Sequence, residues 1–316
     1  MRVPASAMTE TSAAAPVQVS GALVRCGAGS WADRGLVKEG GFYPRKTMKA
    51  AERLAYYASQ LPVVEVSSTH RFPPTPDLAR QWVERTPDGF VFDIQGWSLL
   101  TGLPTFPDSL WEDMRDAVRP EVRDRRRLYP DHLVSAAMDE AWVRFRHALL
   151  PLHEAGRLGV VTFSYPSWFT PKDESRYELA ALTDRLPGYR LAIEFRSAKW
   201  LTDDACEDTL ALLEDLDLAF VCTDTTPDLP WSLPPVVAAT SETAVVRFRG
   251  RAGDDENPWP WPYRYNDDEL ASWVPRVGEL ATSASEVHLL FANTWRDDAV
   301  ANALRMTELL AGDAHH

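Results

Sequence analysis

Runs of β-branched and aromatic residues recur along the chain, and most are followed by a segment whose apolar residues have helical spacing. Residues 190–196 form the clearest of these runs. Because side chains alternate across a strand, Ala192, Glu194 and Arg196 share one face and the larger apolar residues share the other. A face that is apolar first and charged at its C-terminal end is typical of the interior of a parallel β/α barrel, where the strand C-termini carry the chemistry.

Eight runs of this kind predict eight strands. They cover residues 23–31, 62–69, 90–95, 159–163, 191–195, 219–223, 244–248 and 287–291. The intervening helices are predicted over residues 47–59, 76–85, 138–155, 175–186, 203–216, 267–280 and 297–310. Strands that alternate with helices in this way predict an α/β fold, a single-domain TIM-like (β/α)8 barrel over residues 22–312. Residues 1–21, rich in Ala, Ser, Thr and Pro, are predicted to be a disordered N-terminal extension.

A long loop follows the third predicted strand, between residue 95 and about residue 137. It has no clean periodicity and carries a run of arginines interspersed with acidic residues. Long loops in compact domains are usually functional or flexible. Because this one follows a strand C-terminus, we predict that residues 102–131 lie over the mouth of the barrel.

The composition narrows the function classes. The chain has 33 basic and 46 acidic residues, a formal net charge of −13, which disfavours non-specific binding to nucleic acid or to an anionic membrane. No apolar run has the length of a membrane span, and no secretory leader is visible. The 3 cysteines are too few for a disulfide framework and indicate reduced thiols in a cytoplasmic protein. The oligomeric state is left open.

Seven short motifs, taken in order, resemble those of one known family. They lie at residues 29–31 (Gly-Ser-Trp), 42–44 (Phe-Tyr-Pro), 64–69, 194–196, 224–225, 247–251 and 291–294 (Phe-Ala-Asn-Thr). The chain is similar, over about residues 24–310, to the YecE-like family, also called domain of unknown function 72. The resemblance implies a TIM-like barrel and does not imply a reaction. Polar residues of the family are replaced here by Ser67, Gln95, Gly102, Ser164, Ser197, Arg249 and Ala292.

Polar residues near the predicted strand ends form the candidate site. Glu65 and Glu194 are the catalytic candidates, because carboxylates can act as general acids and bases. The candidate binding residues are Trp31, Arg196, Asp224, Arg247, Arg249 and Asn293. The expected ligand is a small polar or anionic molecule, and the expected activity is that of a hydrolase, lyase or isomerase. The alternative is a non-catalytic binder or degenerate family member, in which an internal ion-pair network closes the mouth.

Charge pairing is expected inside the mouth. Glu194 and Arg247 lie on odd-numbered predicted strands, which contribute to the same interior layers, and Asp93 could reach the same layer. Glu65 has no obvious cation nearby and is therefore the better acid candidate. The histidines show no metal-ligand spacing, so no cofactor is assigned. A Mg²⁺ site that uses Glu65, Glu194 or Asp224 is kept as an alternative.

Overall fold

The structure, a computed structural model, describes residues 13–226, 232–251 and 262–313. In these residues, eight parallel strands close into a barrel, because each strand pairs with the next and the last pairs with the first. The barrel strands are β2 (Ala22–Ala28), β3 (Val63–Val66), β4 (Val91–Gln95), β5 (Leu158–Tyr165), β6 (Arg190–Phe195), β7 (Leu218–Asp224), β8 (Thr243–Phe248) and β9 (Glu286–Phe291). The predicted single-domain TIM-like (β/α)8 barrel is therefore confirmed.

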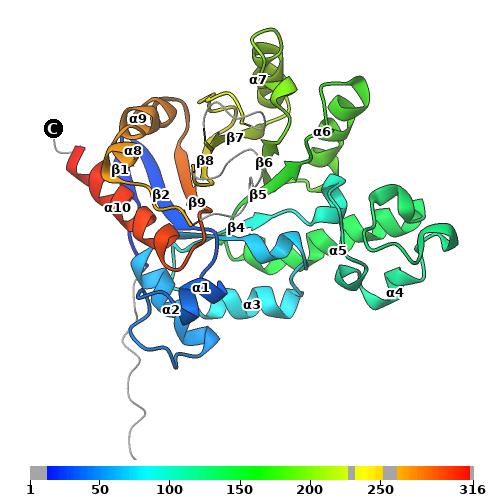
Figure 1. Cartoon of the computed structure of the whole chain (residues 1–316), viewed down its shortest axis with the longest axis horizontal. Helices are drawn as coiled ribbons and strands as arrows, with labels where there is room; N and C mark the ends of the chain where they lie inside the picture. Colours follow the sequence, from blue (N-terminus) through cyan, green and yellow to red (C-terminus); the bar gives the residue numbers. More distant parts are fainter. Residues whose placement is uncertain (1–12, 227–231, 252–261, 314–316) are drawn as a thin grey trace, which may run out of the picture.

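Helices surround the barrel (Figure 1). They are α1 (Arg34–Lys38), α2 (Ala50–Gln60), α3 (Pro76–Glu84), α4 (Glu112–Arg115), α5 (Ser135–Glu154), α6 (Asp173–Arg185), α7 (Cys206–Asp215), α8 (Asp267–Ala271), α9 (Val274–Ser283) and α10 (Asp298–Asp313). The single helix predicted over residues 267–280 is two helices, because a proline in the first turn of α9 begins a new helix after Trp273. No helix within the described ranges has the length and apolar character needed to cross a membrane.

Alternation along the strands separates two apolar layers. Aliphatic side chains, most of them valine or alanine, fill the barrel interior: Val63, Val91, Val160, Ala192, Ala219, Val221, Val245 and Leu290. The larger residues, among them Phe195 and Phe248, point outward into the core beneath the helices. Gly27 lets β2 approach β3, since a Cβ atom there would lie 2.2 Å from the Val63 carbonyl oxygen. The predicted inward face of β6 is confirmed, and it carries Glu194 to the C-terminal mouth.

The predicted disordered extension ends earlier than residue 21. Residues 1–12 lie outside the described residues, but Val17–Val19 form strand β1, which pairs antiparallel with β2. The parallel register of β2 with β3 reaches only Gly27 and Ala28, so the first half of β2 has an edge that β1 covers. Residues 17–19 are ordered because they pair with this open edge of β2, and the composition of the segment does not reveal that pairing.

The segment after β4 folds into short helical turns. Backbone bridges join Thr105 to Leu128 and Val118 to Leu133. Arg144 of α5 donates a 2.8 Å hydrogen bond to Asp113, which anchors α4. Figure 1 shows α4 beside α5, at the side of the barrel. The Phe106 ring of this segment lies 5.6 Å from the guanidinium carbon of Arg71, which follows β3. That residues 102–131 cover the mouth stays a prediction.

Candidate functional site

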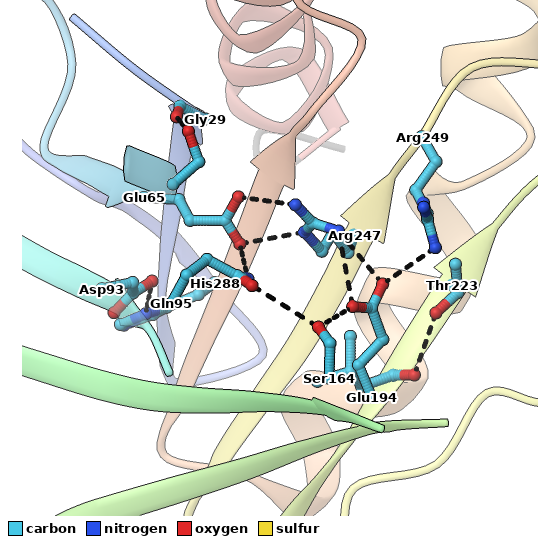
Figure 2. A network of polar contacts seen from close by, with 12 residues as sticks. Gly29, Glu65, Asp93, Gln95, Ser164, Glu194, Thr223, Arg247, Arg249 and His288 are labelled. Carbon is cyan, nitrogen blue, oxygen red and sulfur yellow. Dashed lines mark hydrogen bonds and ion pairs between the residues drawn. The ribbon is translucent and has the colours of Figure 1, made fainter. Parts of the chain in front are cut away.

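The central feature of the mouth is one arginine shared by two carboxylates (Figure 2). Arg247 on β8 donates to Glu65 on β3 through Nε (2.9 Å) and Nη2 (3.0 Å). Its Nη1 atom donates to Glu194 on β6, with distances of 3.1 and 3.4 Å to the two carboxylate oxygens. The fork geometry of a guanidinium group, with five donors in one plane, allows this double pairing. The predicted pair of Glu194 and Arg247 is present in the structure.

Two uncharged side chains complete a ring around this arginine. Gln95 on β4 donates to Glu65 at 2.7 Å, and Ser164 on β5 donates to Glu194. Ser164 also lies 3.4 Å from the amide oxygen of Gln95, which links the two carboxylates on their far sides. Ser164 and Gln95 are departures from the family pattern, and sequence reasoning did not place them among the site residues. Their strand-end positions on β4 and β5 were the available signal.

The charged neighbours of Glu194 hold its carboxyl group ionised at neutral pH. Burial alone would raise the pKa of Glu194, but the surrounding guanidinium groups and the Ser164 hydroxyl outweigh it, so its pKa is well below the usual range. Burial alone would lower the pKa of Arg247, but the two carboxylates raise it above the usual range. Glu194 is therefore a poor general acid, as expected from its pairing.

The expectation for Glu65 is wrong. It was predicted to lack a cation, yet it accepts two hydrogen bonds from Arg247. Arg247 comes from a strand of the other interior layer, and its long side chain reaches across the layers. The guanidinium group also occupies the space between Glu65 and Glu194 (Figure 2). The two carboxylates therefore do not face each other across an open ligand site.

Two further arginines stand at the same mouth. Arg249, which follows β8, lies 3.5 Å from Glu194. Burial lowers the pKa of Arg249 to about 10, so the side chain is still charged at neutral pH. The Nε atom of Arg196, which follows β6, is buried without a hydrogen-bond partner in the described residues. With Arg247, three arginine side chains lie close enough to Glu194 to lower its pKa.

Asp224 lies on the outer face of the barrel, contrary to the prediction. Strand β7 turns Asp224 to the same side as Cys222 and Phe220, which belong to the core beneath the helices. Its carboxylate accepts from Arg251 (2.8 Å to Nε), from the Tyr265 hydroxyl (2.9 Å) and from the Trp273 indole (2.8 Å). Asp224 therefore anchors helices to the barrel and does not join the charged ring.

Asn293 and Trp31 are at the margin of the site. The amide nitrogen of Asn293 donates to the Tyr263 carbonyl oxygen (2.8 Å) and to Asn302 of α10 (3.0 Å). Asn293 also borders a cavity of about 360 Å³ that Arg249 lines. Trp31 packs edge-on against Trp82, with ring centroids 5.5 Å apart, and lines a neighbouring cleft of about 800 Å³. Within the described residues, neither Asn293 nor Trp31 forms a hydrogen bond with Glu65 or Glu194.

A second buried network lies deeper in the barrel. Asp93 does not reach Glu194; its Oδ2 atom is 2.7 Å from Nδ1 of His288, and its Oδ1 atom accepts from the Val160 amide at 2.8 Å. His288 in turn lies 3.5 Å from Glu286. Burial alone would lower the pKa of His288, but the two carboxylates outweigh it and raise the pKa to about 9. The partner of Asp93 is thus a protonated histidine, which the sequence analysis did not identify.

The Mg²⁺ alternative has no support in the donor set. Within the described residues, no group of three or more His, Cys, Asp and Glu side chains is arranged to hold a metal ion. The carboxylates that were proposed as ligands, Glu65, Glu194 and Asp224, each bind a guanidinium group instead.

Comparisons with known proteins agree with the fold. Residues 25–316 match a family described as "Protein of unknown function DUF72". The chain is 26% identical over 300 residues to the UPF0759 protein YunF of Bacillus subtilis (strain 168), covering 91% of this chain and 95% of YunF. A DUF72 family protein from Enterococcus faecalis V583 has a similar structure, with a TM-score of 0.73, 23% identity and coverage of 91% of this chain and 95% of that one. A DUF72 family protein from Thermotoga maritima MSB8 has a TM-score of 0.69, 24% identity and coverage of 91% and 98%.

Proposed function

The chain belongs to the DUF72 family, whose description names no activity, and we propose from its own residues that the mouth of its barrel binds a small anionic molecule. The anionic group would lie against Arg249 and Arg196. Glu65 and Glu194 would orient the arginines rather than react with the ligand. The proposal keeps the expected ligand class and favours the non-catalytic alternative over acid–base chemistry by these two carboxylates.

The observation that carries the proposal is the difference in solvent exposure between the carboxylates and the arginines of the ring. The side chains of Glu65 and Glu194 are 1% and 0% exposed, whereas the side chain of Arg249 is 18% exposed. The two carboxylates of the ring are therefore covered, and the Arg249 side chain reaches the surface of the mouth. An anion that enters would meet a guanidinium group before it met either carboxylate.

Two further observations support an anion. Three arginines, Arg196, Arg247 and Arg249, act on Glu194, and the buried Nε atom of Arg196 has no acceptor among the described residues. Buried donors without acceptors are costly, so a bound oxyanion would relieve that cost. The cavity lined by Arg249 has a volume of about 360 Å³, which suits a small molecule, and its other charged wall residues are Arg34, Arg296, Asp33 and Glu39. Carboxylates and phosphates are the groups that arginines bind in two-pronged geometry.

Acid–base catalysis by the two glutamates has less support. A general base must reach the proton that it removes, and both carboxylates already accept hydrogen bonds from Arg247 and from a neighbouring polar side chain. The low pKa of Glu194 also makes it a weak base.

The test is a melting-temperature titration with inorganic phosphate at constant ionic strength. A ligand at a hundred times its Kd stabilises the native state by about 2.7 kcal/mol. For a chain of 316 residues, this corresponds to a rise of about 4 °C in Tm. Arg249→Met should abolish the rise. The control is Arg146→Met on the exposed side of α5, which removes the same charge and should keep the rise. A wild-type Tm that does not respond, or an equal response in Arg249→Met, would refute the proposal.

A further inference from the structure

His70 lies beside the charged ring and has no role in the site described so far. It ends the short 3-10 helix η1 (Ser67–His70), which follows β3. Its ring lines the cleft of about 800 Å³ together with Trp31 and Arg71. The cleft and the cavity of Arg249 share Asp33, Arg34 and Thr294 as wall residues, so the two spaces adjoin. One ligand can therefore extend from Arg249 toward His70.

The hydrogen bond of His70 fixes which ring nitrogen carries the proton. Its Nδ1 atom lies 3.3 Å from the carbonyl oxygen of Gly96. A carbonyl oxygen accepts and cannot donate, so Nδ1 must carry the proton. In the neutral ring, Nε2 then presents a lone pair. Within the described residues the hydrogen bond of the ring is the one made by Nδ1, so Nε2 is the atom that can accept from a ligand.

The surroundings of His70 keep its ring neutral. Burial and the charges of Arg196 and Arg247 lower the pKa of His70 to about 4, although Glu194 opposes them. At neutral pH the ring therefore adds no charge to the mouth and acts as a hydrogen-bond acceptor. An acceptor beside a cluster of arginines distinguishes between anions, because it favours those that also carry a donor.

We propose that His70 is a ligand-positioning residue, whose Nε2 atom accepts a hydrogen bond from a hydroxyl group of the anion bound at Arg249. This inference rests on the proposed function and narrows the ligand to hydroxylated anions, such as a polyol phosphate or a hydroxy acid. The hydroxyl proton stays on the ligand, so no bond is made or broken.

The experiment compares glycerol 3-phosphate with n-propyl phosphate by calorimetric titration. The two probes have the same charge and chain length and differ in their hydroxyl groups. Wild type should bind glycerol 3-phosphate about three- to tenfold more tightly, the usual worth of one hydrogen bond. His70→Phe should bring this ratio close to one and leave the affinity for n-propyl phosphate unchanged, which also reports that the variant is folded. His70→Gln, which keeps an acceptor, should restore part of the ratio.

Two controls separate the possible failures. His147→Phe, an exposed histidine on α5, should keep the wild-type ratio. The Nε2 resonance of ¹⁵N-labelled His70 should shift with glycerol 3-phosphate and stay unchanged with n-propyl phosphate. Equal affinities in wild type, or an unchanged ratio in His70→Phe, would overturn this inference alone, because anion binding would persist. Failure of both phosphates to bind wild type would overturn the proposed function and this inference with it.

Discussion

Replacing Arg247 by methionine tests the charged ring most directly. Methionine keeps much of the side-chain volume and removes the guanidinium group that pairs with both Glu65 and Glu194. These carboxylates are 1% and 0% exposed, so water cannot replace the lost partner. Breaking a buried ion pair by removing one member costs about 3–5 kcal/mol. We expect the upper part of this range, because one substitution leaves two buried carboxylates, although Gln95 and Ser164 still donate to them.

The loss should depend on pH, and the sign follows from Glu194. In wild type the pKa of Glu194 is lowered, so its ionised form stabilises the fold above the unfolded pKa, and this contribution is lost as the pH falls through the folded pKa. Without Arg247, burial raises the pKa of Glu194, and protonation then favours the folded variant. The difference in unfolding free energy between variant and wild type should therefore shrink from pH 7 toward about pH 5.

Urea denaturation followed by circular dichroism at both pH values measures this difference. The triple variant Glu65→Gln, Glu194→Gln, Arg247→Met is the matched control, because it removes all three charges and should recover most of the lost stability. If Arg247→Met lowers the unfolding free energy by less than about 1 kcal/mol at pH 7, the reasoning is contradicted, because exposed ion pairs contribute no more than that. An equal loss at both pH values, or a triple variant as unstable as the single one, would do the same.

The remaining predictions concern other buried features. The pKa of His288 is raised to about 9. Its contribution to the unfolding free energy, on the order of 3 kcal/mol, should therefore be present below about pH 6.5 and be lost as the pH rises toward 9. His288→Gln should remove this pH dependence in urea denaturation, and an unchanged profile would count against the buried pair. Asp224→Asn should lower the unfolding free energy by about 1.5–3 kcal/mol, the worth of a hydrogen bond to a charged group, and leave phosphate affinity unchanged, whereas a loss of affinity would return Asp224 to the ligand site. Gly27→Ala should lower the unfolding free energy by about 1–3 kcal/mol, because its Cβ atom would lie 2.2 Å from a strand carbonyl oxygen. Gly278→Ala in α9, where nothing lies within 4 Å of the new Cβ atom, should instead raise the unfolding free energy by about 0.5–1 kcal/mol. Similar unfolding midpoints for the two variants would disprove the packing argument.

The position of Asp224 could not be read from the pattern of its strand. In β7 the residues before Asp224 are apolar on both faces, because a parallel strand of a barrel is covered on both sides. The pattern therefore gives no sign of which face is inward at the strand end, and Asp224 was grouped with the candidate binding residues of the mouth although it lies on the outer face. In β6 the small Ala192 and the charged Glu194 alternate with larger residues, so the inward face was readable there.

The sequence by itself determined the eight strands, their parallel order and the end of the barrel at which Glu65, Glu194 and Arg247 meet. These follow from local periodicity and from the rules that connect strands and helices. Only the tertiary structure decided which charges pair. Glu65 and Arg247 are 182 residues apart and meet because the barrel closes. Their contact depends on the reach of one arginine across two interior layers, and side-chain reach in a closed barrel is not encoded in the spacing of residues along a strand.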